Sequence, residues 1–207
     1  MKKHQEVLNR LHDVLDHYKP MQPAYYPYLD EIVQPRYFDR KENLYRQGEV
    51  IRQAYFVSSG FMTANHYNEN GDKRLVHIFS KDEIVYSQSF TKHTPSDYEL
   101  VACKGAYILA ITYAEVHAIY EKFPDVQEQA MLILAGREQR ELEHLRLLSQ
   151  PGVLRVETFY RAYPELLARS KVIRDADIAS YLFLSAASLR RFRRHLLESG
   201  RLKLFLP

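Results

Sequence analysis

The sequence predicts an α+β fold: a block of short strands, then a long helix, then a small helical module. Three observations predict it. From about residue 35, short segments rich in Tyr, Phe, Val and Ile alternate with turn residues. A helical pattern, broken at Pro124, then runs to Pro151. Two short helical patterns with a brief break between them lie near the C-terminus.

The composition is that of an ordinary globular protein. Of 207 residues, 46% are hydrophobic and 27% are charged. No apolar run approaches the roughly 20 residues of a membrane span, and the charged start MKKHQEVLNRLHDVLDHYK lacks a signal-peptide core. The single cysteine, Cys103, lies between apolar residues, which predicts a buried thiol. We therefore expect a reducing, cytoplasmic compartment and no membrane partner.

The elements before the long helix are predicted from the spacing of their apolar residues and from turn residues. Apolar residues from Val7 to Tyr18 have helical spacing, and Pro20, Pro23 and Pro27 are expected to break that pattern. Strands are predicted next, with Asn70-Gly71 as a hairpin turn, which indicates a small barrel or sandwich. The predicted strands cover residues 55–57, 61–67, 74–79, 99–103 and 106–111, and Ser58-Ser59-Gly60 is predicted to be a turn.

The long helical segment, residues 124–150, carries an apolar stripe near heptad spacing. Such a helix either packs on its own domain or pairs with a second copy of itself. Pro151-Gly152 then marks a boundary, followed by a helix over 153–163. The stripe consists of Met131, Leu134, Leu142, Leu145 and Leu148.

The C-terminal segment is basic and has helix-turn-helix spacing. Residues 151–207 hold 11 Lys and Arg against 5 Asp and Glu, a net +6, whereas residues 1–150 hold 18 against 21, a net −3. This asymmetry is typical of nucleic-acid binders, although a basic solvated tail also fits. Asp175 or Asp177 is predicted to cap a first helix over 178–183, and Ser185 a second over 187–197.

The second of these helices has a cationic face. Leu189, Phe192 and Leu196 are expected to pack inward, and Arg190, Arg191 and Arg194 lie opposite them with Ala187. In a major groove such arginines contact guanine edges and phosphates, and Ser185 and Ser188 near the helix start can bond a phosphate. The alternative is a solvated, arginine-rich amphipathic helix.

The order of elements resembles that of the Crp/Fnr family of transcription regulators, over nearly the whole chain. The resemblance rests on Leu44, Gly48-Glu49, Tyr55-Phe56-Val57, Gly60, Gly71, Phe79, Glu83-Ile84-Val85 and the segment FYRAYPELLARSKVIRDADIASYLFLSAASLRRFRRHL, which looks like the short regulators of Bacteroidetes. It implies a double-stranded β-roll sensor domain (1–123), a dimerisation helix (124–150) and a helix-turn-helix domain (151–207).

The same resemblance implies double-stranded DNA as partner, a homodimer, and a guanine contact by Arg191. Three features depart from the family pattern. Phe183 occupies the turn position that usually holds Gly, Ala186 and Ala187 offer only methyl groups to bases, and the remaining ESGRLKLFLP allows only a truncated wing.

Family members that bind cyclic nucleotides use a Gly-Glu pair for the ribose and an Arg-Ser pair for the phosphate. When the family pattern is placed along this chain without gaps, the two pairs fall at Val85-Tyr86 and Ser96-Asp97. The ribose acceptor is missing, and a carboxylate replaces the phosphate cation. We therefore expect a degenerate cassette that binds no cyclic nucleotide.

Other chemistry finds little support in the sequence. His66 and His77 lie on predicted strands, where a solvated or hydrogen-bonded histidine is the better interpretation than a haem ligand. We find no phosphate loop, metal spacing or nucleophile motif, so we expect no cofactor and no enzyme activity. The predicted function is a DNA-binding regulator that senses an unknown small-molecule effector or none. The alternative is a ligand-binding or protein-interaction β-roll whose helix-turn-helix no longer binds DNA specifically.

Overall fold

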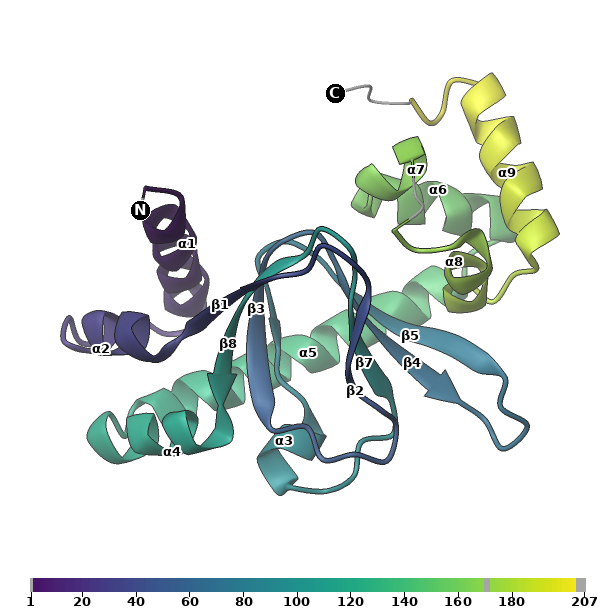
Figure 1. The fold of residues 1–207 in the computed structure, drawn as a ribbon. Coiled ribbons are helices and arrows are strands. Elements are labelled where there is room, and N and C mark those ends of the chain that lie inside the picture. The colour runs from purple at the N-terminus through teal and green to yellow at the C-terminus, as the bar shows by residue number, and fades with distance from the viewer. Residues whose placement is uncertain (1, 170–171, 204–207) are drawn as a thin grey trace. The chain divides into compact units, whose positions relative to one another are not determined.

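The computed structural model describes residues 2–169 and 172–203 and is drawn in Figure 1. Its contacts form two compact units, one of Met1–His66 with Ile78–Arg137 and one of Tyr67–His77 with Glu138–Pro207. Both α5 and the tip of a β-hairpin contain residues of the second unit. The helices are α1 (Lys2–Tyr18), α2 (Tyr25–Ile32), α3 (Gln88–Lys92), α4 (Tyr113–Lys122), α5 (Val126–Leu148), α6 (Gly152–Ala162), α7 (Glu165–Arg169), α8 (Asp175–Tyr181) and α9 (Ala186–Glu198).

Two four-stranded antiparallel sheets form the predicted β-roll. The first sheet has the strand order β1-β8-β3-β6 and the second the order β2-β7-β4-β5. The fold class predicted from the sequence is therefore confirmed. The strands are β1 (Gln34–Tyr37), β2 (Glu42–Tyr45), β3 (Gln53–Ser59), β4 (Met62–Tyr67), β5 (Lys73–Phe79), β6 (Glu83–Val85), β7 (Glu99–Ala102) and β8 (Tyr107–Thr112).

The two central strands of the first sheet, β3 and β8, are buried on both faces because they carry apolar residues at successive positions. Tyr55 and Val57 of β3 pack inside the roll, and Phe56 between them packs against helices outside it. The paired strand β8 repeats this arrangement with Ile108 inside and Leu109 outside. Cys103 is buried, as predicted.

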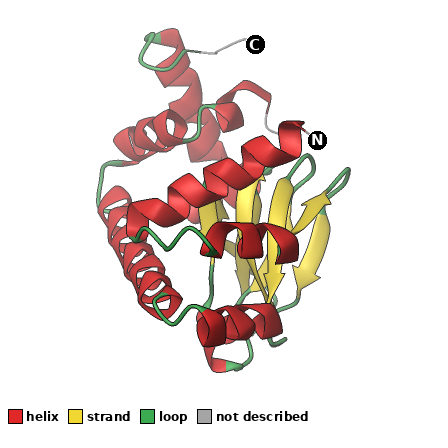
Figure 2. Cartoon of the chain, turned by 90° about the vertical axis from the view of Figure 1, so that its left-hand side faces the viewer, coloured by secondary structure: helices red, strands yellow, loops and turns green. Residues whose placement is uncertain are grey.

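Helices from both ends of the first unit cover the outer face of this sheet. Figure 2 shows α1, at the N mark, crossing in front of the strands, with the short helix α2 below it. One apolar cluster joins these helices to α4, to the start of α5 and to the sheet. Its buried members are Val7, Leu8, Leu11, Leu15, Tyr25, Leu29, Val33, Phe56, Leu109, Ile119, Phe123, Val126 and Ile133.

Two turns of the β-roll differ in how well the sequence predicted them. The hairpin at Asn70-Gly71 is present, since β4 ends at Tyr67 and β5 begins at Lys73. The turn predicted at residues 58–60 is shorter, because β3 continues through Ser59 and only Gly60 has a positive φ, +74°. A side chain on Gly60 would lie 2.7 Å from the Cα atom of Ala106, so the backbone requires glycine here.

The proline-rich segment after α1 contains a helix that the sequence pattern did not predict. Helix α2 spans Tyr25–Ile32 and includes Pro27 in its first turn. The first four N–H groups of a helix have no acceptor within it, so a proline there removes no hydrogen bond. The break at Pro124 between α4 and α5 is confirmed, and Thr112 caps α4, since its side chain accepts the N–H of Glu115.

Candidate nucleic-acid interface

Helices α8 and α9 form the predicted helix-turn-helix within the second unit. Residues 182–185 connect the two helices, which is the short turn that the motif needs. Ser185 caps α9, because its hydroxyl oxygen accepts the N–H of Ser188 at 3.0 Å. Helices α6 and α8 pack against α9 around a fully buried core. That core includes Val156, Phe159, Ile178, Leu182, Leu189 and Leu196.

The turn between the two helices places Phe183 in the left-handed region, with a φ of +53°. The N–H of Phe183 donates to the carbonyl of Ser180 at 3.2 Å, and that of Leu184 donates to Ala179 at 2.9 Å. This pair of bonds is the Schellman arrangement, in which the left-handed residue is usually glycine. The departure predicted at Phe183 therefore takes the form of a strained non-glycine corner. The exposed ring lies 4.1 Å from the guanidinium carbon of Arg74.

The hairpin tip that carries Arg74 is bound to α8 by polar contacts of its neighbours. Lys73 Nζ lies 2.9 Å from Asp177 Oδ1, and the N–H of Leu75 donates to Ser180 Oγ at 3.0 Å. Burial raises the pKa of Asp177, but hydrogen bonds from Arg174 and Lys73 outweigh it, so this pKa is lowered overall. No local sequence pattern predicts this contact, because it joins residues about a hundred positions apart.

The four arginines of α9 have two different roles in the fold. Arg193 binds Asp175 through two bonds of 2.7 Å and donates to the hydroxyl of Tyr160 at 2.9 Å. The guanidinium hydrogen bonds hold the pKa of Asp175 below its usual range. Arg193 thus ties α9 to α8 and α6.

Asp175 and Asp177 do not cap α8 as predicted. The residue at the N-cap is Arg174, whose side chain makes no capping bond, and both aspartates lie in the first turn of the helix. Their carboxylates bind cations of other elements instead, Arg193 for Asp175 and Lys73 for Asp177. Acidic residues in a first turn still favour the helix through its dipole.

The other three arginines of α9 are exposed. Arg191 and Arg194 lie on the side of α9 opposite the buried Leu189 and Leu196, and Arg190 flanks them. Within the described part of the chain these three form no ion pair, in contrast to Arg193. The guanidinium of Arg191 lies 5.0 Å from the ring centre of Phe192, and Arg190 Nε donates to Ala186 O at 3.2 Å. A free cationic edge of this kind can bind phosphates and guanine edges.

The predicted phosphate ligands at the start of α9 are partly engaged with each other. The hydroxyl of Ser185 donates to Ser188 Oγ at 3.0 Å while it accepts the N–H of that residue. The hydroxyl proton of Ser188 remains available to an incoming acceptor. Ala187 is exposed beside them and Ala186 half-buried, so this end of the helix offers methyl groups and one hydroxyl.

The segment after α9 returns to the helical core. Arg201 forms an ion pair with the buried carboxylate of Glu157 on α6, and Leu202 is buried. Residues 199–203 form no strand, and the remainder of the predicted wing, residues 204–207, lies outside the described residues.

The residues counted as a cyclic-nucleotide cassette are held in the roll by their own contacts. Val85 is buried in β6 opposite Tyr55, and the hydroxyl of Tyr86 lies 3.1 Å from that of Tyr120 on α4. Ser96 is buried, and its hydroxyl donates to the carbonyl of Tyr98 at 2.8 Å.

Asp97, the last residue of the counted cassette, has an exposed side chain. Its backbone carbonyl lies 2.9 Å from Nδ1 of His66, so that histidine is a hydrogen-bonded surface residue. Across the described residues no group of three His, Cys, Asp or Glu side chains is arranged to hold a metal ion.

The predicted dimer stripe runs along α5. Met131 is 70% exposed, Leu142 50% and Leu145 61%, while Leu134 and Leu148 are half-buried. Each of the three exposed residues therefore leaves at least half of its surface in water. Among the described helices, none is long and apolar enough to cross a membrane.

Comparison with known proteins finds the same fold and related sequences. The Cyclic nucleotide-binding domain family matches residues 35–123. The Fumarate nitrate reduction regulatory protein of Klebsiella oxytoca is 22% identical over 185 residues, which cover 84% of this chain and 73% of that protein.

Two solved structures show the likeness of the fold. FixK2 from Bradyrhizobium japonicum matches with a TM-score of 0.66 and 18% identity, over 82% of this chain and 86% of that one. The Catabolite Activator Protein of Thermus thermophilus matches with a TM-score of 0.53 and 20% identity, over 88% of this chain and 87% of that one. The predicted resemblance to the Crp/Fnr regulators is therefore confirmed: residues 35–123 match the Cyclic nucleotide-binding domain family, and the chain is similar to such regulators in sequence and in fold.

Proposed function

We propose that this protein is a dimeric DNA-binding transcription regulator whose β-roll no longer binds cyclic nucleotides. The observation that supports DNA binding best is the difference between the arginines of α9. One arginine of the helix is bound within the fold, whereas Arg190, Arg191 and Arg194 stay exposed and unpaired among the described residues. Solubility alone does not require three unpaired arginines on the edge of the helix that would enter a major groove.

The first test is the salt dependence of binding to random duplex DNA. If Arg190 and Arg194 of each protomer neutralise one phosphate each, a dimer releases four counterions. The slope of log K against log salt is then about −3.6, and affinity falls about a hundredfold between 50 and 200 mM salt. Fluorescence anisotropy with a labelled random duplex measures this slope. Absence of binding at 50 mM salt would favour the alternative, an interaction module whose helix-turn-helix has lost DNA binding.

The dimer is supported by the exposed stripe on α5. Three large side chains at near-heptad spacing on one helix are the pattern that a second copy covers in a coiled-coil seam. Leu142→Glu places a charge in this seam and should yield a monomer in light scattering at micromolar concentration. Gln139→Glu changes an exposed polar residue on the same helix and should leave the dimer intact. A monomeric wild-type protein refutes the seam.

The absence of cyclic-nucleotide binding is supported by the contacts of Ser96 and by the lack of a cation at Asp97. The Ser96 hydroxyl is bonded to backbone, and a carboxylate beside it repels a phosphate. Cyclic AMP or cyclic GMP at a hundred times a dissociation constant adds about 2.7 kcal/mol of stability to a protein that binds it. Thermal melts at millimolar nucleotide should show no rise, and a clear rise contradicts this proposal.

A further inference from the structure

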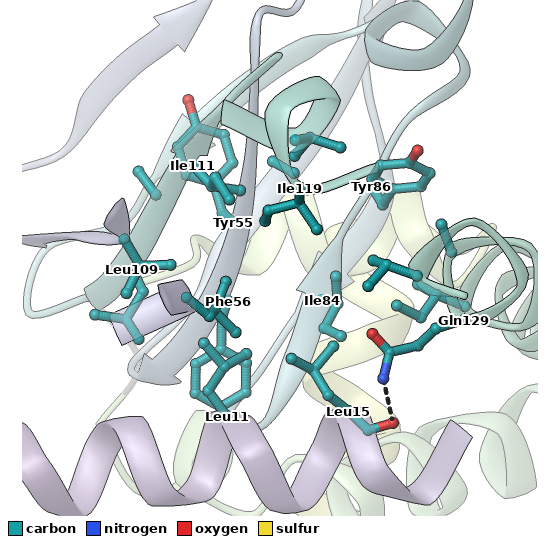
Figure 3. Close-up of a pocket in the computed structure, with 18 of the residues that line it drawn as sticks. Leu11, Leu15, Tyr55, Phe56, Ile84, Tyr86, Leu109, Ile111, Ile119 and Gln129 are labelled. Carbon is teal, nitrogen blue, oxygen red and sulfur yellow. Dashed lines mark hydrogen bonds between the residues drawn. The ribbon is translucent and has the colours of Figure 1, made fainter. Parts of the chain in front are cut away.

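A pocket of about 100 Å³ lies outside the roll, between the first sheet and the helices that cover it. Figure 3 shows Phe56, Leu109 and Ile84 on the sheet side and Leu11 and Leu15 of α1 below them. Of the four residues of the counted cyclic-nucleotide cassette, Tyr86 lines this pocket, whereas Val85, Ser96 and Asp97 do not.

The walls of this pocket restrict the chemistry of any occupant. Its lining is aliphatic and aromatic except for the hydroxyls of four tyrosines and the amide of Gln129, and it includes no Lys, Arg, His, Asp or Glu. An ion would lose its hydration there without gaining a partner. The size is somewhat below that of an engineered cavity of 150 Å³ that binds benzene, so the occupant has a single ring or a short chain.

Gln129 supplies one hydrogen-bond acceptor with a fixed orientation. Its Nε2 donates to the carbonyl oxygens of Leu15 at 3.2 Å and Lys19 at 2.8 Å, as the dashed line in Figure 3 shows for Leu15. Two carbonyl partners require the amide nitrogen on that side, so the other end of the amide must be the oxygen. That Oε1 atom has one long contact, 3.5 Å from the hydroxyl of Tyr25, although Gln129 is only 1% exposed.

We propose that this pocket is a binding site for a small, uncharged, apolar molecule that carries one hydroxyl or N–H group. The ring or chain fills the space between the sheet and the helices, and the donor group bonds to Gln129 Oε1. Since Gln129 and Ile133 are residues of α5, the occupant contacts the first half of the long helix directly. This site does not depend on the DNA-binding function proposed above.

A series of ring compounds of similar size tests both the site and its chemistry. Cyclohexanol has the donor, cyclohexanone has only an acceptor, methylcyclohexane has neither, and cyclohexanecarboxylate carries a charge. Titrations of the full chain followed by methyl NMR should give saturable shifts at Leu15, Ile84 and Leu109 with cyclohexanol. Cyclohexanone and methylcyclohexane should bind about fivefold more weakly, the worth of one neutral hydrogen bond, and the carboxylate should produce no shift.

A filled pocket provides the second arm of the experiment. Ala130→Met places a longer, adaptable side chain into the space from α5 and should abolish the cyclohexanol shifts. Ala114→Met on the exposed side of α4 is the matched control and should bind as the wild type does. If the Ala130→Met protein does not fold, the compound series on the wild-type protein decides alone. The proposal is overturned if cyclohexanol gives no saturable shift, if the carboxylate binds as well, or if folded Ala130→Met protein still binds.

Discussion

Replacement of Arg193 by Ala should destabilise the C-terminal unit, whereas replacement of the neighbouring Arg194 should not. Arg193 makes a bidentate pair with Asp175 and a further bond to Tyr160, and Arg194 is exposed. Both variants remove one arginine from the same helix, so differences in helix propensity and net charge cancel between them. The comparison therefore isolates the contacts of Arg193.

The size of the effect follows from the burial of the pair. Exposed ion pairs contribute about 0–1 kcal/mol, and loss of one partner from a buried pair costs about 3–5 kcal/mol. The side chains of Arg193 and Asp175 are 22% and 31% exposed, which places this pair between the two cases. The hydroxyl of the buried Tyr160 also loses its partner, at about 1 kcal/mol. We expect a total loss of about 2–3 kcal/mol for Arg193→Ala, and a change within about 0.5 kcal/mol for Arg194→Ala.

Native-state hydrogen exchange of the α6 and α9 amides is the suitable assay. The chain has no tryptophan to report unfolding of one unit, and a global melt mixes the two units. The effect also has a defined pH dependence. Arg193 lowers the pKa of Asp175 in the folded state, so the difference between wild type and Arg193→Ala is complete above about pH 4 and shrinks as pH falls further. Equal protection in Arg193→Ala and Arg194→Ala would refute the role given to this pair.

Two further predictions concern the same unit. In the Arg74→Ala protein, Phe183→Gly should raise the free energy of unfolding by about 1 kcal/mol in urea melts, because glycine relieves the left-handed corner. In the protein that keeps Arg74, loss of the contact between the Phe183 ring and Arg74 should offset most of this gain. A large gain from Phe183→Gly with Arg74 present would contradict the stacking. Burial lowers the pKa of His144, which stacks on Tyr181, below its usual 6.5. The unfolded state then binds more protons, so stability falls as pH drops below about 6.5, and His144→Phe should flatten this loss between pH 7.5 and 5.5. A variant with the same pH slope as wild type would show that other groups cause it.

The elements that the sequence predicted best are those with strong local signals. The Asn70-Gly71 hairpin, the break at Pro124 and the cap at Ser185 each depend on residues within a few positions of one another. Helix α2 was not predicted because a proline is expected to end a helical pattern, although in the first turn of a helix Pro27 removes no hydrogen bond.

The contacts that were missed join distant parts of the chain. Lys73 meets Asp177 and Arg193 meets Asp175 only after the fold forms, so capping was the natural local interpretation of both aspartates. The acceptor at Gln129 could not be predicted for the same reason, since its orientation is set by the carbonyls of Leu15 in α1 and Lys19 just after it, more than a hundred residues earlier. The exposed face of α9, in contrast, follows from helical periodicity alone.

The most direct test of the DNA-binding account compares Arg191→Ala and Arg194→Ala on a duplex selected from random sequence. The account predicts two half-sites about 34 Å apart, one for each α9 of a dimer. Arg191→Ala should cost about 1–3 kcal/mol per half-site on the selected duplex and little on random DNA. Arg194→Ala should weaken both duplexes alike and reduce the salt slope by about one per half-site. If neither variant changes the affinity for either duplex, α9 is a solvated face and the account is wrong.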